Sequence, residues 1–243
     1  MTDLVSSIPF VDGVINPLPG EGGTDAESTD EVLKRAPREL RDRDRAVTEA
    51  DFERIASAAS RNLAKTRCIP EMDQHGEQTP GWVTLLLVPR SGDRQPVPST
   101  AMKERVRDAM DAQAPATLVE TDRLVVRGPS YVEVSVEATL VARRGTRISQ
   151  FEASTTDALD AFLHPLTGGP ENEGWAFGTV PCLSDFYALL EGLAGTDYVD
   201  DLTVTVTGSE TAVTLTEGEP TPTVAPDTLV FSGVHEITAR GGR

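Results

Sequence analysis

Apolar and polar residues alternate along the chain with two periods, and these periods predict helices interleaved with strands. Helical spacing first appears after residue 47, in Phe52, Ile55, Ala56, Ala59 and Leu63. Thr48 precedes this stretch as a candidate N-cap, and Asp51 stands where a capping box places its acid. Val47 and Phe52 occupy the two positions of a hydrophobic staple. These signals predict that a helix begins just after Thr48.

Strands and helices continue to residue 165. Residues 81–88 form an apolar run closed by Pro89, which predicts a buried strand, and Ser99 opens a second helix. Leu124 to Arg127 predict a short strand that ends in a turn at Gly128-Pro129. From residue 131 to residue 140 the apolar residues occupy every second position, as in a half-exposed antiparallel strand. A third helix follows, and His164 and Pro165 end it. The order β-α-β-β-α indicates an α+β fold of split β-α-β (ferredoxin-like) sandwich units.

A second unit is expected after the loop Thr167-Gly168-Gly169-Pro170. Ser184 is the candidate cap of a short helix, residues 202–206 and 213–215 predict a β-hairpin around Gly208, and residues 229–237 predict a last strand. We therefore divide the chain into an extended arm (1–46), an α+β domain (47–165) and a smaller α+β domain with the hairpin (166–243).

The first 46 residues do not have the pattern of a domain. Prolines and glycines between residues 15 and 23 predict an extended, turn-rich arm. Residues 34–45 hold six basic and three acidic side chains, a local positive surplus in a very acidic chain. This stretch is either a solvated helix with internal charge pairs or a segment that contacts an acidic neighbour.

The overall charge limits the classes of partner. The chain has 39 acidic and 22 basic residues, a formal charge of -17, so we expect no binding to nucleic acid or to an anionic membrane. Only Lys34, Lys65 and Lys103 are lysines. An acidic, lysine-poor surface suits a salt-rich cytoplasm, which predicts a halophilic source. The alternative is an ordinary acidic protein from a GC-rich genome.

The remaining sequence signals bear on compartment. Cys68 and Cys182 have no metal-binding spacing, and we expect two buried thiols. The sequence has neither a membrane-spanning apolar run nor a signal peptide, which predicts assembly in the cytoplasm.

Motifs that carry chemistry are missing from the sequence. It contains no phosphate-binding loop, dinucleotide fingerprint, zinc-protease motif or nucleophile elbow. His164 is expected to bond a helix-terminal carbonyl, and His235 to be a structural histidine. The loop at Thr167 either contacts a ligand or anchors Trp175 and Phe177 on the core. We expect no enzyme activity, no cofactor, no metal site and no small-molecule substrate.

Two stretches of sequence resemble a known family. The first runs from Asn16-Pro17-Leu18-Pro19-Gly20 through Ala36-Pro37 to Asp51-Phe52-Glu53, and the second from Phe162-Leu163-His164-Pro165-Leu166-Thr167-Gly168-Gly169 through Gly174-Trp175-Ala176-Phe177-Gly178 to Ser184-Asp185-Phe186-Tyr187. In this order, and with the ending 229–237, they resemble the baseplate J-like family of contractile phage tails and contractile injection systems. The resemblance spans roughly residues 11–238 and indicates a short, haloarchaeal-type member.

The resemblance implies a structural wedge subunit of a contractile tail-like particle. Such a subunit pairs with itself and with other wedge proteins around the tail hub, contacts the sheath indirectly, and ends in the particle's baseplate. Longer members carry a sizeable region before the Asn-Pro-x-Pro stretch, so this chain is either a shortened member or the C-terminal half of a split one. The candidate interface residues are Arg35, Arg38, Arg41, Arg45, Asn16, Pro17, Trp175 and Phe177. The alternative function is a stand-alone β-rich module that binds a sugar or protein.

Overall fold

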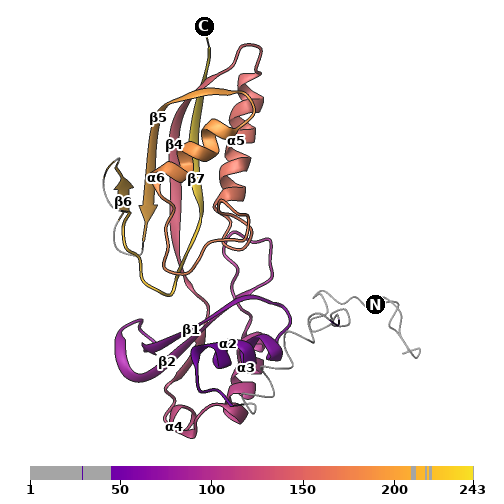
Figure 1. Ribbon diagram of the computed structural model, residues 1–243, viewed down its shortest axis with the longest axis vertical. Helices are drawn as coiled ribbons and strands as arrows, with labels where there is room; N and C mark the ends of the chain where they lie inside the picture. The colour runs from indigo at the N-terminus through magenta and orange to yellow at the C-terminus, as the bar shows by residue number, and fades with distance from the viewer. Residues whose placement is uncertain (1–28, 30–44, 209–211, 217, 219–220, 243) are drawn as a thin grey trace, which may run out of the picture.

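The computed structural model describes residue 29 and residues 45–208, 212–216, 218 and 221–242. Two β-sheets lie end to end along the long axis of the molecule, each with its own helices (Figure 1). The predicted α+β class with split β-α-β character is confirmed. The predicted N-terminal arm lies outside the described residues, apart from residue 29 and its last two positions.

The first sheet belongs to the N-terminal unit. Its elements are α2 (Glu49–Ala59), β1 (Leu63–Met72), β2 (Gln78–Pro89), α3 (Thr100–Gln113), the short α4 (Ala116–Val119) and β3 (Leu124–Arg127). The strand order is β1-β2-β3, with β1 antiparallel and β3 parallel to β2. Helix α3 makes the crossover that a parallel pair requires. Strand β2 is buried on both faces, because Leu85 and Leu87 meet the helices whereas Leu86 packs on the other side.

The second sheet is longer and carries its helices on one face. Its elements are β4 (Ser130–Ala142), α5 (Ile148–Phe162), α6 (Leu183–Gly192), β5 (Thr196–Thr207), β6 (Ala212–Leu215) and β7 (Thr228–Gly241). The strand order is β6-β5-β4-β7; β4 is antiparallel to β5 and parallel to β7. The alternating apolar residues of β4 form the core with α5 and α6, and the polar set lies on the opposite face.

Strand pairing differs from the expected grouping in one respect. We expected β4 and α5 to close the first domain at residue 165, but β4 is a central strand of the second sheet and α5 packs on β7. The reason is that β4 pairs with strands more than 50 residues later in the chain, a separation that local periodicity does not register. The split β-α-β connectivity is therefore β4-α5-α6-β5 with β7 returning beside β4.

Local signals at the start of α2 are partly confirmed. Thr48 accepts the Asp51 amide at 3.3 Å and Asp51 accepts the Thr48 amide at 2.7 Å, so the capping box forms. The amides of Val47 and Thr48 and the Thr48 hydroxyl donate to the Asp51 carboxylate and lower its pKa, although burial opposes them with the largest single effect. The staple is not made by Val47, which is 78% exposed, and the buried residue before the cap is Ala46.

Strand β1 was missed, and Leu63 was wrongly placed on the preceding helix. The helix ends at Ala59, and Leu63 begins an edge strand with the mixed sequence LAKTRCIPEM. Pro70 within it is tolerated because an edge strand has one side without ladder partners. The strand's polar composition, which suits an edge, hides the period-2 signal.

Three smaller expectations are also corrected. Helix α6 is capped at Cys182, whose amide donates to Asp185 at 2.8 Å, so Ser184 lies inside the helix. Both cysteines are free thiols, but Cys182 is exposed and only Cys68 is buried. The His164 ring accepts the amides of Leu166 and Thr167 at 3.2 Å each, so its Nδ1 orders the following loop and does not bond a helix carbonyl.

The predicted hairpin is confirmed: β5 and β6 pair antiparallel, with Val206 opposite Val213.

On the outer edge of each sheet, a glutamate from a helix accepts one strand amide. Glu53 of α2 accepts the Cys68 amide of β1 at 2.9 Å, and Glu152 of α5 accepts the Ala239 amide of β7 at 2.9 Å. Exposed edge amides are sites where another strand can add. At these two positions the edge amide already has a partner within the chain.

Candidate functional site

Most of the predicted arm residues cannot be placed. Asn16, Pro17, Arg35, Arg38 and Arg41 lie outside the described residues. Arg45 is described, and it is exposed just before the buried Ala46. The amide of Ala46 donates to the Gln113 carbonyl at the end of α3, 3.0 Å away. The arm therefore leaves the folded body beside the end of α3.

Trp175 is an anchor within the chain. The residue is 8% exposed, its indole Nε1 donates to the Phe162 carbonyl at 2.9 Å, and the Phe162 ring meets the indole edge-on at a centroid distance of 5.3 Å. This geometry favours the anchoring interpretation of the loop at Thr167. The partner-facing role expected for Trp175 is corrected, because the indole is buried against its own core.

The glycines of the same loop are required by close backbone approaches. A Cβ on Gly168 would lie 2.1 Å from the Phe162 carbonyl oxygen, and one on Gly174 would lie 2.4 Å from the Pro165 oxygen. Gly174 also has φ +76°, a conformation that side chains disfavour. The glycine and tryptophan pattern of residues 162–178 therefore encodes a tight structural loop.

This loop also holds the two sheets together. Phe177 packs against Ile69, Met72 and Leu86 on the helix-free face of the first sheet. Lys65 of β1 donates to the carbonyl oxygen of Trp175 at 3.1 Å, and burial lowers the pKa of its ammonium. Phe177 thus makes an internal contact between the two units.

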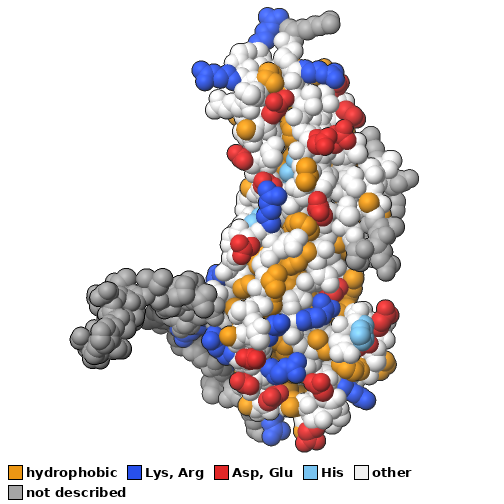
Figure 2. Space-filling view, turned by 180° about the vertical axis from the view of Figure 1, so that it is seen from behind, with side chains coloured by type: hydrophobic (Ala, Val, Ile, Leu, Met, Phe, Trp, Pro, Cys, Tyr) orange, Lys and Arg blue, Asp and Glu red, His pale blue; other side chains and the backbone are white. Residues whose placement is uncertain are grey.

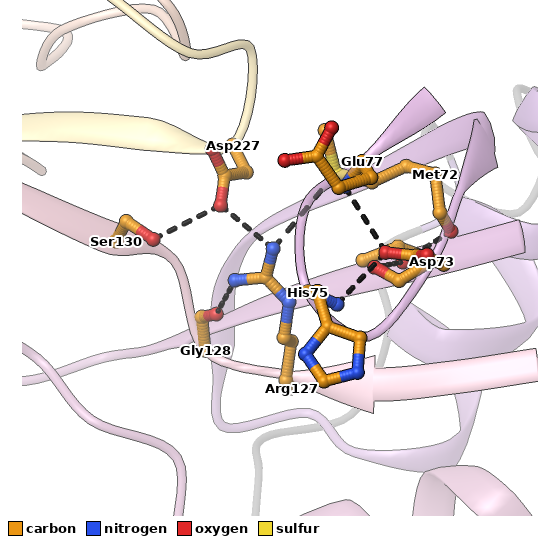
Figure 3. A network of polar contacts seen from close by, with 9 residues as sticks. Met72, Asp73, His75, Glu77, Arg127, Gly128, Ser130 and Asp227 are labelled. Atoms are coloured by element: carbon orange, nitrogen blue, oxygen red, sulfur yellow. Dashed lines mark hydrogen bonds and ion pairs between the residues drawn. The ribbon is translucent and has the colours of Figure 1, made fainter. Parts of the chain in front are cut away.

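A buried ion pair lies where the chain passes from one sheet to the other (Figure 3). Arg127, the last residue of β3, bonds Asp227 at 2.6 Å, and Ser130 at the start of β4 donates to the same Asp227 oxygen at 2.9 Å. The Asp227 side chain is 7% exposed and that of Arg127 is 24% exposed. The guanidinium also donates to the Gly128 carbonyl and contacts the Met72 sulfur. This network joins β3, β4 and the residue before β7.

The loop between β2 and α3 completes the junction from the other side. Arg94 pairs with Asp160 of α5 at 2.8 Å, and the Tyr131 hydroxyl donates to the Pro96 carbonyl at 2.8 Å. Burial raises the pKa of the Tyr131 phenol. A backbone hydrogen bond with Asp93 ties His164 to the same loop, and burial lowers the pKa of its ring. Each unit therefore extends one loop onto the other.

One cluster has the residue types of a hydrolase triad. The Ser232 hydroxyl lies 2.8 Å from His235 Nε2 and bonds Asp160, and Asp160 Oδ1 is 3.8 Å from His235 Nε2. These residues come from α5 and β7, so sequence spacing did not bring them together. The His235 side chain is 1% exposed, and burial lowers the pKa of its ring.

The protons of this cluster are arranged against base catalysis. The Val136 amide donates to His235 Nδ1 at 3.2 Å, so the proton of the neutral ring is on Nε2, which faces Ser232. The serine hydroxyl then donates to Asp160 and accepts from the histidine. A histidine nitrogen that donates its own proton to the serine oxygen cannot accept the serine proton, and a catalytic triad requires that acceptance. The histidine instead binds the Val136 amide beside a bulge at Gly233 and Val234 in β7.

The helix-free face of the second sheet is polar and acidic. Its rows across the strands are Phe231–Glu133–Thr207, Glu236–Glu137–Thr203 and Thr238–Thr139–Asp201. The bulge hollows the face between two of these rows, leaving a cavity of about 240 Å³ whose lining includes Ser135, Glu137, Thr203, Thr205 and Glu236. In the view from behind, acidic and uncharged side chains occupy much of the upper unit, whereas blue side chains are more frequent over the lower unit (Figure 2).

A second hollow lies on the helical side. It measures about 540 Å³ and runs between α5 and α6 beside the loop at Thr167, and Ala158, Ala161, Ala188 and Leu189 contribute apolar surface. Asp185 is its one carboxylate, so two acids do not converge there. Within the described residues no group of three or more His, Cys, Asp or Glu side chains is placed to hold a metal ion. A search of the same residues for a long apolar helix able to cross a bilayer found none.

The fold class defined by these features is an α+β chain of two mixed sheets joined by reciprocal loops. No protein-family model matches the sequence, and the search of curated proteins finds no match. Among solved structures, the chain is similar to a chain of the anti-feeding prophage baseplate, determined by cryo-electron microscopy with six-fold symmetry. The TM-score is 0.61 at 16% identity, covering 95% of this chain and 47% of that one.

The likeness at this identity is one of fold. It extends over nearly the whole chain and therefore includes both sheets. This chain spans about half the length of the baseplate chain that it matches.

Proposed function

We propose that this chain is a structural baseplate subunit of a contractile tail-like particle, a wedge protein of the baseplate J-like kind without catalytic activity. The observation that carries the proposal is the shared fold with a baseplate chain over 95% of this chain. The motif resemblance supports it independently, because it rests on residue identities and not on the backbone. An injection system and a tailed virus are both compatible with the proposal.

The structure of the motif region agrees with a structural role. The second resembling stretch, residues 162–187, contains the loop that packs Phe177 on the first sheet and receives Lys65. Contacts on both sides of the junction hold the two sheets together, which suits a subunit that is held between neighbours. The Ser232–His235–Asp160 cluster has its protons in the wrong arrangement for base catalysis, which supports a non-enzymatic role.

The proposed partners are a second copy of the chain, other wedge proteins and the tail hub, with the sheath contacted indirectly. Residues 11–46 lie across an adjacent subunit, where Arg35, Arg38, Arg41 and Arg45 meet carboxylates. Arginine suits such contacts because its planar fork binds a carboxylate with two parallel hydrogen bonds. Assembly takes place in the cytoplasm, and the subunit then remains in the particle.

The test is electron microscopy of particles purified from the source cells, with an affinity label on this chain. We expect the label at the baseplate end of a sheathed tail in the wild type. When the chain lacks residues 1–46, we expect the label to be absent from the baseplate end of the particles. Sheathed particles that lack this chain altogether would refute the baseplate role.

The alternative is a stand-alone binding module that uses the threonine-rich strand β5. Thr203 and Thr205 do line the hollow on the open sheet face. This alternative expects a monomer that binds a sugar without sheath or hub proteins, and co-purification with those proteins would count against it.

A further inference from the structure

No helix or strand of the described residues covers the helix-free face of the second sheet. Helices α5 and α6 occupy the other face, and Glu137 and Glu236 are exposed on this one. Residues 131–243 contain 17 acidic and 5 basic residues, so most of the chain's negative charge belongs to this unit. A partner for this face therefore has to bring positive charge.

Like charges stand side by side on this face. Glu137 of β4 pairs directly with Glu236 of β7, and neighbouring strands lie about 4.8 Å apart. Like charges in such a position destabilise a sheet. Arg240 is a cation of the same face, but it pairs with Asp200 at 3.6 Å, toward the end of the strands. A cation bound between the two glutamates would relieve their repulsion.

The bulge in β7 creates a hollow beside the two glutamates. The hollow of about 240 Å³ lies beside Val234, and the hydroxyls of Ser135, Thr203 and Thr205 line it together with both glutamates. A guanidinium is planar and donates five hydrogen bonds in fixed directions, so carboxylates and hydroxyls around one hollow match it better than they match an ammonium.

The chain's own sequence contains a segment of the required charge. Residues 34–45 hold six basic and three acidic side chains, five of the basic ones being arginines. From these observations we infer that the open face of β4, β5 and β7 binds the arginine-rich segment 34–45 of a second copy of this chain, with Glu137 and Glu236 as the central acceptors. This inference rests on the proposed function, and it names the surface on which the arm lies.

Strand addition at the sheet edge is the competing way to hold a second copy. Glu152 already accepts the Ala239 amide at the β7 edge, and the bulge at Gly233 breaks the regular ladder of that strand. Both features blunt an edge against another strand. Face binding is therefore favoured over strand addition at β7.

The test uses zero-length carbodiimide coupling, which joins a lysine amine to a carboxylate in direct contact. Lys34 lies within the arginine-rich segment, and the only other lysines are Lys65, which is bonded to Trp175, and Lys103 of α3. Full-length chains labelled with nitrogen-14 and nitrogen-15 are mixed, coupled and analysed by mass spectrometry. We expect isotopically mixed peptides that join Lys34 to Glu137 or Glu236.

The variant E137Q/E236Q should reduce the self-association constant by at least tenfold, whereas its loss of the mixed Lys34 product follows from the missing carboxylates alone. Glu104→Gln, on the exposed side of α3, is the matched control and should leave both unchanged. The variant should also unfold at a temperature no lower than wild type, since it removes a like-charge pair. Adding R38E/R41E to an E137R/E236R chain should restore self-association, which a merely structural role of the glutamates would not.

Coupling of Lys34 only within one copy, or to carboxylates of the first unit, would overturn the inference. A chain that remains monomeric at a concentration on the order of 100 μM and gives no mixed product would also overturn the inference. Either result leaves the baseplate location of the chain to be decided by the labelled particles, so the two proposals fail separately.

Discussion

The Arg127–Asp227 pair should be the most sensitive connection between the two sheets. Replacing Arg127 by Met leaves the Asp227 carboxylate with the Ser130 hydroxyl as its remaining side-chain donor. Breaking a fully buried pair by removing one partner costs about 3–5 kcal/mol. Because the Arg127 side chain is 24% exposed and water can replace part of it, we expect about 2–3 kcal/mol for Arg127→Met.

The two partners should not be equivalent. Asp227→Asn keeps an acceptor for the Ser130 hydroxyl. The charge that it leaves unpaired is that of Arg127, the more exposed partner, so we expect the free energy of unfolding to fall by about 1–2 kcal/mol. The double variant R127M/D227L should lose less than the two single losses combined, since an apolar pair avoids the unpaired buried charge. Asp122→Asn is a control, because Asp122 pairs with Arg107 at 3.3 Å on the surface and 88% of its side chain is exposed.

Urea unfolding followed by tryptophan fluorescence gives the measurement. Trp175 reports on the second core, and Trp82 of β2 reports on the first sheet; the conservative variant W82F isolates Trp175. In the wild type we expect far-ultraviolet circular dichroism and fluorescence to give one transition, and in Arg127→Met we expect the two to separate. A loss below about 0.5 kcal/mol with coincident transitions would refute the reasoning.

Four further outcomes follow from the structure. Gly168→Ala should cost at least about 3 kcal/mol or prevent folding, because its Cβ would lie 2.1 Å from a backbone carbonyl oxygen; Gly92→Ala, with open space around it, should change stability by less than about 0.5 kcal/mol. A disulfide reagent at pH 7 should modify one thiol per folded chain, Cys182, since burial raises the pKa of Cys68 to about 12; modification of both before unfolding would contradict this. His235 has a lowered pKa in the folded state through burial, so its contribution to stability is complete above about pH 6.5 and is lost as the pH falls through the folded value; unfolding free energies between about pH 7.5 and 5 should fall less steeply in His235→Gln, and equal slopes would disprove the assignment. If the source is halophilic, the thermal midpoint should rise by at least about 10 °C between low and molar salt, because screening removes self-repulsion in a chain of charge -17; equal midpoints would indicate an ordinary acidic protein.

Periodicity located most elements because it reports which face of each is buried. The alternation of β4, the apolar run of β2 and the helical spacing of α2 and α5 all correspond to observed elements. Strand β1 escaped because an edge strand buries little and its residues are mixed in character. Val47 was predicted as a staple from position alone, and the direction of the entering chain left it exposed.

In the candidate site, too, the sequence indicated local motifs but not the contacts between distant residues. The loop glycines and Trp175 could be recognised as a motif in the sequence. That this loop connects the two sheets became visible only from the packing of Phe177 against β1 and β2. The cluster of Ser232, His235 and Asp160 had no sequence signal, because 72 residues separate its aspartate and serine. Its proton arrangement depends on an amide of a third element, β4.

What the sequence by itself determined is local and compositional: the α+β class, the capping box of α2, the hairpin, the acidic charge and the lack of catalytic motifs. Each of these depends on neighbours along the chain or on totals, which a sequence states directly. Tertiary structure alone decided that β4 belongs to the second sheet, that Arg127 and Asp227 close the junction, and that Glu137 and Glu236 stand side by side on an open face. These depend on pairings across about 100 residues, which are set by the packing of whole sheets and leave no periodic trace in the sequence.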